Sequence, residues 1–107
     1  MSAVATTRIS QTAVLTLDNA PVNGLGLALR TALVEAFQAA LDDAEVSAIV
    51  LTGAGRMFSA GADITEFGTP KSRTAPALPE IIDMIEQAGK PVVAAIHGNA
   101  LGGGLEL

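Results

Sequence analysis

Two short runs of small and β-branched apolar residues, each stopped by a glycine, place the strongest constraint on how this chain can fold. They are "SAIVLTG" at 47–53 and "KPVVAAIHG" at 90–98. A strand buried inside a sheet has this composition, because neither of its faces has to meet water. A third run, "TAVLTLD" at 12–18, alternates in polarity and is also typical of a strand. We therefore expect three strands.

Segments with helical periodicity separate these strands. Between 29 and 42 one set of positions is apolar, at spacings of three and four: Leu29, Leu33, Phe37, Ala40 and Leu41. The other positions are polar: Arg30, Glu35, Gln38 and Asp42. A second amphipathic helix is expected to start at Pro79. The order of strands and helices predicts an α/β layered architecture in one domain.

The connection "GTPKSRTAPAL" at 68–78 is rich in proline and small polar residues, and we expect it to be mobile. Before this segment, Asp63 is expected to cap a helical turn. Glu66, three residues later, would complete a capping box with it. His97, at the exit of the last strand, is expected to be structural.

Composition excludes several classes of function. With 107 residues, 50% of them hydrophobic, the chain should bury a core rather than stay disordered. Cysteine is absent and there is one histidine, so we expect no disulfide and no metal site. Six basic residues against eleven acidic ones, without tryptophan or tyrosine, make nucleic acid an unsuitable partner.

The sequence also bears on the cellular location of the protein. No apolar segment follows Arg8 as it would in a secretory signal. The longest apolar stretch, at 91–107, is interrupted by polar residues and is too short to span a bilayer. We therefore expect a cytoplasmic protein without a membrane span.

Two loops of small residues, "SAGAD" at 59–63 and "LGGG" at 101–104, could carry chemistry. Such loops let a ligand approach the backbone closely and leave N–H groups free to donate. Two converging amides would form an oxyanion hole. Ordinary turns and a solvated Glu106 are the simpler readings, although Leu105 and Leu107 would partly desolvate that carboxylate.

The segments "RMFSAGADITEF" and "KPVVAAIHGNALGGGLEL" resemble the two signature segments of the enoyl-CoA hydratase/isomerase (crotonase) family. The resemblance implies that residues 1–107 are an incomplete domain of this family, the N-terminal part of a truncated crotonase-like ββα spiral fold. The segment "DNAPVNGLGLALR" further resembles the hydratase region of bifunctional enoyl-CoA hydratase/3-hydroxyacyl-CoA dehydrogenases.

The resemblance also implies roles for individual residues. The amides of Ala62 and Gly103 would hold a thioester oxygen, and Glu106 would activate the water. The positive end of the helix that begins near Gly103 would favour the enolate. The substrate-binding residues would be Ala60, Gly61, Ala62, Asp63, Ile64, Gly102 and Gly103. A second catalytic glutamate would lie beyond Leu107, so we expect the 107-residue chain alone to be inactive.

The implied reaction is the hydration of 2-trans-enoyl-CoA to 3-hydroxyacyl-CoA in fatty-acid β-oxidation. A Δ3,Δ2-enoyl-CoA isomerase and a non-catalytic CoA-binding or interaction module are the alternatives. Coenzyme A would be part of the acyl-CoA substrate and not a separate cofactor, and NAD would be needed only by a downstream dehydrogenase domain. Family members are homo-oligomers or parts of larger β-oxidation enzymes, so we expect the same here.

Overall fold

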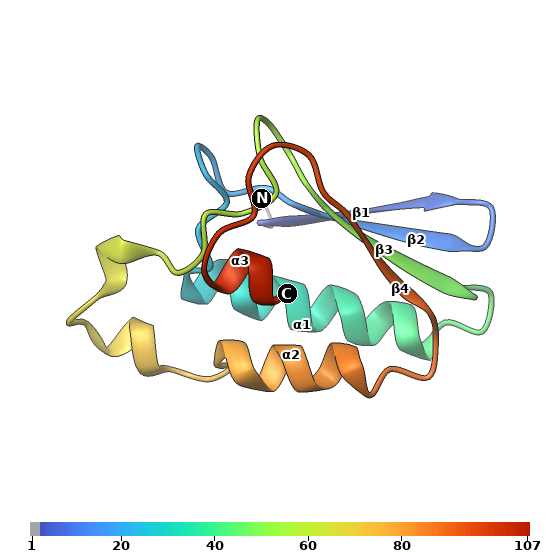
Figure 1. Cartoon of the computed structure of the whole chain (residues 1–107). Coiled ribbons are helices and arrows are strands. Elements are labelled where there is room, and N and C mark those ends of the chain that lie inside the picture. The colour runs from blue at the N-terminus through green and yellow to red at the C-terminus, as the bar shows by residue number, and fades with distance from the viewer. Residues whose placement is uncertain (1–2) are drawn as a thin grey trace.

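Four strands form a mixed sheet whose one face is covered by helices (Figure 1). The computed structural model describes residues 3–107. In order across the sheet the strands are β1 Val4–Ile9, β2 Thr12–Leu17, β3 Ala48–Gly53 and β4 Val92–Ala95. β1 is antiparallel to β2, whereas β2, β3 and β4 are mutually parallel.

Helix α1 (Leu27–Asp42) connects β2 to β3, and α2 (Leu78–Glu86) precedes β4. They run side by side under the sheet (Figure 1). The connection from β3 to α2 contains two 3-10 turns, η1 (Ile64–Glu66) and η2 (Pro70–Arg73), and a short helix, α3 (Gly103–Glu106), follows β4. The expected α/β layers, the three expected strands and both expected amphipathic helices are thus confirmed.

The core lies between the sheet and α1. Alternate residues of β2 and β3 point into it, so that their side chains are buried while their neighbours are only half-buried. The largest fully buried side chains are Phe37, Phe58, Leu15, Leu17, Leu29, Leu33, Ile49 and Leu51. β4 is mostly exposed, and Val93 in its middle has 56% of its surface accessible. Burial on both faces, as its apolar sequence suggested, is therefore not found for β4 within this chain.

Strand β1 was not expected from the sequence. It forms a hairpin with β2, in the register Val4 opposite Leu17 and Ile9 opposite Thr12. Only Val4 is buried, and the other residues of β1 are exposed. An edge strand with one buried residue shows no apolar alternation, so the sequence pattern that marks the other strands is missing here.

Arg30 corrects the expected polar face of α1. It is only 6% exposed, and its guanidinium donates hydrogen bonds to four carbonyl oxygens. One acceptor is Leu25 O, and the others are Lys71 O, Thr74 O and Pro76 O. The proline-rich segment at 68–78 is therefore not structureless: it contains η2 and is bonded to α1. Its mobility stays a prediction.

Candidate active site

The two loops of small residues lie side by side at the carboxyl ends of β3 and β4. A single parallel bridge pairs Ser59 with Ala100. The Leu101 N–H donates to Ser59 O at 3.0 Å, and the Phe58 N–H donates to Asn99 O at 3.1 Å. Because β3 and β4 are adjacent and parallel, segments far apart in the sequence emerge at one edge of the sheet.

The backbone amides of Ala62 and Gly103 come together at this junction. A Cβ built on Gly103 would lie 3.9 Å from the Ala62 nitrogen, and one built on Gly61 would lie 3.1 Å from the Gly103 nitrogen. Within residues 3–107 neither amide donates a hydrogen bond to a protein acceptor. Two neighbouring N–H groups are thus available to an oxygen atom supplied from outside.

Glycine is required at two points of this junction. Gly61 has a φ of +100°, a left-handed conformation that L side chains rarely adopt, and a Cβ there would meet Leu101 O at 2.9 Å. A Cβ on Gly104 would collide with the backbone oxygen of Ser59. The two loops can approach each other this closely only because neither residue carries a side chain.

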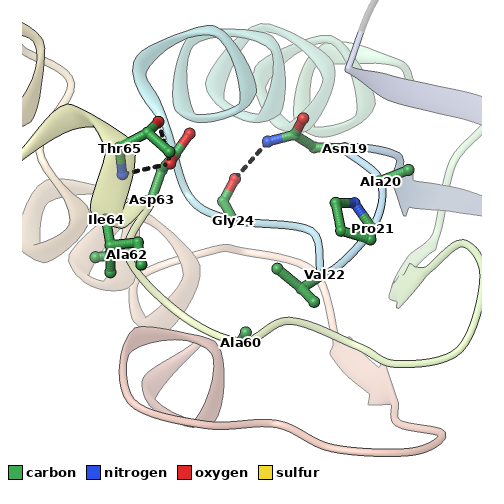
Figure 2. A pocket seen from close by; sticks show the side chains of 10 residues that line it. All are labelled: Asn19, Ala20, Pro21, Val22, Gly24, Ala60, Ala62, Asp63, Ile64 and Thr65. Atoms are coloured by element: carbon green, nitrogen blue, oxygen red, sulfur yellow. Dashed lines mark hydrogen bonds between the residues drawn. The ribbon is translucent and has the colours of Figure 1, made fainter.

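A cavity of about 340 Å³ opens beside the "SAGAD" loop (Figure 2). One side is formed by the turn after β2, and the other by the residues that precede and begin η1. It is lined by Asn19, Ala20, Pro21, Val22, Gly24, Ala60, Ala62, Asp63, Ile64 and Thr65. Of the expected substrate-binding residues, Ala60, Ala62, Asp63 and Ile64 line this cavity. Gly61, Gly102 and Gly103 do not, although Gly61 and Gly103 stand at the amide junction.

A second, smaller cavity of about 190 Å³ adjoins the first loop from another side. Its walls come from the start of α1, from α2 and from the segment before α2: Leu25, Arg30, Ala62, Ser72, Ala77, Leu78 and Pro79. Ala62 borders both cavities.

Glu106 lies at the end of α3, three residues after Gly103. Its backbone N–H donates to Gly102 O at 3.2 Å, which completes the helical turn. The residue is exposed, as is Leu105, so the partial desolvation expected from its apolar neighbours is not found in this chain. The expected helix start near Gly103 is confirmed.

The side chains of Asp63 and Glu66 cap two different elements. The Asp63 carboxylate accepts from Thr65 N at 3.0 Å, so the expected cap of η1 is confirmed. Glu66 does not complete the expected capping box. Both of its carboxylate oxygens lie 3.1 Å from the backbone nitrogen of Leu27, and one lies 3.6 Å from Arg30 Nη1. Glu66 therefore caps α1 and not its own turn.

His97 has the structural position that the sequence suggested. It follows β4, and its Nε2 atom lies 2.8 Å from Gly55 O. The ring thereby joins the exit of β4 to the loop after β3.

Two buried polar residues near the site were missed by the sequence reasoning. Asn23 is 1% exposed and Ser59 is fully buried, and their side chains make six hydrogen bonds with backbone atoms. Asn23 has a φ of 53°. The dipeptide Asn23-Gly24 in "PVNG" is a turn signal, and it was the one available indication of this left-handed backbone. Burial of the asparagine side chain has no comparable signature.

The chain is similar in sequence to known proteins over most of its length. The family model described as "Enoyl-CoA hydratase/isomerase" matches residues 8–107. A "Peroxisomal bifunctional enzyme" of Danio rerio is 48% identical over 95 residues, covering 89% of this chain and 13% of the relative. A "Probable enoyl-CoA hydratase" of Bacillus subtilis is 44% identical over 100 residues, covering 89% of this chain and 39% of the relative.

Solved structures agree with these relatives. An enoyl-CoA hydratase from Bacillus anthracis superimposes with a TM-score of 0.85 at 32% identity, covering 97% of this chain and 43% of that one. An enoyl-CoA hydratase from Polaromonas gives 0.82 at 35% identity, covering 94% and 42%. This chain thus spans less than half the length of the proteins it resembles. No helix in residues 3–107 is long and apolar enough to cross a membrane. Its crotonase-like α/β fold and the match over residues 8–107 show that the chain belongs to the enoyl-CoA hydratase/isomerase family.

Proposed function

We propose that this chain is the thioester-binding, N-terminal part of an enoyl-CoA hydratase domain that acts in fatty-acid β-oxidation. The observation that carries the proposal is the pair of unpartnered amides at Ala62 and Gly103. Both would donate to the thioester oxygen of a 2-trans-enoyl-CoA. One preorganised donor of this kind stabilises a developing oxyanion by about 3 kcal/mol.

Coenzyme A would occupy the cavity of about 340 Å³ beside the "SAGAD" loop. Its walls present the backbone of the "SAGAD" loop and the small side chains of Ala60 and Ala62. A narrow adenine ring or pantetheine arm can lie close to a backbone with side chains of this size. Gly61, Gly102 and Gly103 would then contact the ligand at its thioester end. No separate cofactor is needed, because coenzyme A arrives as part of the substrate.

Glu106 would act on the water. Its carboxylate would take a proton from the water as the oxygen bonds to the β-carbon of the substrate. The electron pair of the C=C double bond moves toward the thioester, and the resulting enolate oxygen stays bound to the Ala62 and Gly103 amides. A proton must then reach the α-carbon to give 3-hydroxyacyl-CoA. We propose that a second glutamate, on a part of the domain beyond Leu107, handles this proton, which leaves the 107-residue chain inactive alone.

The relatives guide the proposals on partners and location. Several are bifunctional or multifunctional enzymes, which supports placement in a larger β-oxidation enzyme or a homo-oligomer, with NAD serving only a separate dehydrogenase domain. Their names include peroxisomal and glyoxysomal proteins. The cytoplasmic location therefore stays a prediction.

A chimera tests the proposed reaction. Residues 1–107 replace the matching part of the Bacillus subtilis relative, and loss of the conjugated thioester absorbance of 2-butenoyl-CoA is followed. Glu106→Gln should lower kcat by about a hundredfold or more, because an amide cannot accept the proton. Glu45→Gln, on an exposed turn, is the matched control.

Wild-type turnover in the Glu106→Gln chimera would overturn the role of Glu106. Turnover of a 3-enoyl-CoA in place of the 2-enoyl substrate would favour the isomerase. Binding of a thioester without any hydration, measured by calorimetry, would favour the CoA-binding module.

A further inference from the structure

A buried asparagine connects the turn after β2 with the loop after β3. The Asn23 Nδ2 atom donates to Ala54 O and Met57 O, both at 3.0 Å, and to Phe58 O at 3.1 Å. Its Oδ1 atom accepts from Asn19 N at 2.9 Å. Every polar atom of this side chain is therefore paired, and three of the acceptors belong to the residues that lead into the "SAGAD" loop.

The backbone of the same turn holds the next three residues of that loop. Three bonds join the two segments: Ser59 Oγ to Asn23 O at 2.8 Å, Ala60 N to Val22 O at 2.9 Å, and Leu25 N to Gly61 O at 2.8 Å. The turn thus contacts residues 59, 60 and 61, each through one hydrogen bond. These bonds fix the backbone of the loop that ends at Ala62.

These bonds determine where the Ala62 N–H points. In a trans peptide the carbonyl of one residue and the N–H of the next point in opposite directions. The Gly61 carbonyl is fixed on the Leu25 N–H, and the Gly61 N–H donates to Ser59 Oγ at 3.1 Å. The Ala62 N–H must therefore point away from the Leu25 N–H, and a Cβ built on Gly103 would lie 3.9 Å from the Ala62 nitrogen.

We infer that Asn23 is a positioning residue, which sets the direction of the Ala62 N–H through Ser59 and the Gly61 peptide. The inference deepens the proposed function and rests on it for its chemical meaning. Asn23 does not touch the substrate. It keeps the turn in the left-handed conformation in which the Val22 and Asn23 carbonyls and the Leu25 N–H face the loop.

Asn23→Gly is the sharpest variant, because glycine keeps the φ of 53° without strain and removes only the side-chain bonds. Residual dipolar couplings on the ¹⁵N-labelled 107-residue chain report the direction of each N–H. The coupling of Ala62 should change in this variant while those in α1 stay as in the wild type. Val46→Ala is the control for general loss of stability, because Val46 is buried before β3 begins, at the opposite end of the strand from the site.

A binding measurement adds the functional readout. Calorimetry compares butyryl-CoA with a thioether of coenzyme A that lacks the carbonyl oxygen. The wild type should bind the thioester about tenfold more tightly than the thioether, which corresponds to the free energy of one hydrogen bond. Asn23→Gly should lose this difference in affinity while it still binds the thioether. Val46→Ala should retain the preference.

The outcomes separate the inference from the proposed function. Unchanged Ala62 coupling in Asn23→Gly overturns the inference. A changed coupling in a protein that never distinguishes thioester from thioether supports the positioning role and overturns the oxyanion role. If Asn23→Gly does not fold, Ser59→Ala removes the hydroxyl between Asn23 O and Gly61 N, and an unmoved Ala62 coupling there overturns the inference equally.

Discussion

The carboxylate of Glu66 accepts the backbone N–H of Leu27, with both oxygens 3.1 Å from that nitrogen. Leu27 is the first residue of α1, and Gly26 before it offers no side-chain cap. A residue 39 positions further along the chain thus satisfies an N–H at the helix start, where the helix dipole favours negative charge. The same carboxylate lies 3.6 Å from Arg30. The segment that follows the candidate active site is therefore anchored to α1.

Removal of this cap should lower stability. Glu66→Ala is expected to reduce the free energy of unfolding by about 1–2 kcal/mol, because the Leu27 N–H loses its acceptor and Arg30 its nearest carboxylate. Glu66→Gln should reduce the free energy of unfolding by less, since its amide oxygen can still accept the Leu27 N–H. Urea denaturation measures both. Glu35→Ala, exposed in the middle of α1, is the control and should change little. An equal loss in the control would contradict the capping role.

Arg30 should resist even conservative replacement. Arg30→Lys keeps the charge, but one ammonium cannot reach the four carbonyls that the guanidinium joins. We expect a loss of about 2–4 kcal/mol in the free energy of unfolding, since buried acceptors are left unpaired. Limited proteolysis should show faster cleavage at 70–76.

Arg8→Lys is the matched control for this change. Arg8 and Asp43 form an exposed ion pair at 3.2 Å, and such pairs contribute less than about 1 kcal/mol. Similar losses for the two lysine variants would show that the buried bonds of Arg30 are not what stabilises the segment.

Gly103→Ala should separate ligand binding from stability. The new methyl would meet only the ends of two flexible side chains, Leu78 at 2.6 Å and Leu25 at 3.3 Å, which can move aside. It would also lie 3.9 Å from the Ala62 nitrogen, in the space that a thioester oxygen needs. We expect the free energy of unfolding to change by less than about 1 kcal/mol, because alanine also has a higher helix propensity than glycine. Calorimetry should show at least tenfold weaker binding of butyryl-CoA, the loss of about one hydrogen bond.

Gly89→Ala is the glycine control, because a Cβ there has no atom within 4 Å. It should leave the affinity for butyryl-CoA unchanged. Undiminished affinity in Gly103→Ala would contradict the proposed position of the thioester oxygen.

The chain alone should self-associate. β4 is an edge strand, and apolar side chains on it and after it are more than half exposed: Val93 56%, Ile96 54%, Leu101 53% and Leu105 70%. Unpaired strand edges and exposed apolar surface both favour association. Sedimentation velocity should show a mass that rises with concentration, and Ile96→Lys should reduce it. Ile9→Lys, at the opposite edge of the sheet, should have little effect, and an equal effect would show that association does not involve β4.

The sequence predicted the parts of the fold that have strong local patterns. The periodicity of α1, the apolar runs of β3 and β4 and the start of α3 all lie where they were expected. β1 could not be found in the same way, because Val4 is its only buried residue. Hairpin pairing with β2, a tertiary effect, makes it a strand.

The site was predictable only where its chemistry is in the backbone. Glycines at 61 and 103 are visible as a pattern, whereas Arg30, Glu66 and Asn23 act through partners distant in the sequence. Arg30 looked like a surface residue of an amphipathic helix, and Glu66 had a plausible local partner in Asp63. In each case the side chain bonds to partners far away in the sequence, and no window of neighbouring residues contains that information.

The single bridge between Ser59 and Ala100 has a consequence for the order of folding. The segments that carry Ala62 and Gly103 are joined by the pairing of β3 with β4 and of Ser59 with Ala100, whose partners are more than forty positions apart. Parallel pairing over such a separation closes a long loop and is slow. The proposed oxyanion hole should therefore be among the last features to assemble on the folding pathway, and binding of a thioester would report that β3 and β4 are paired in register.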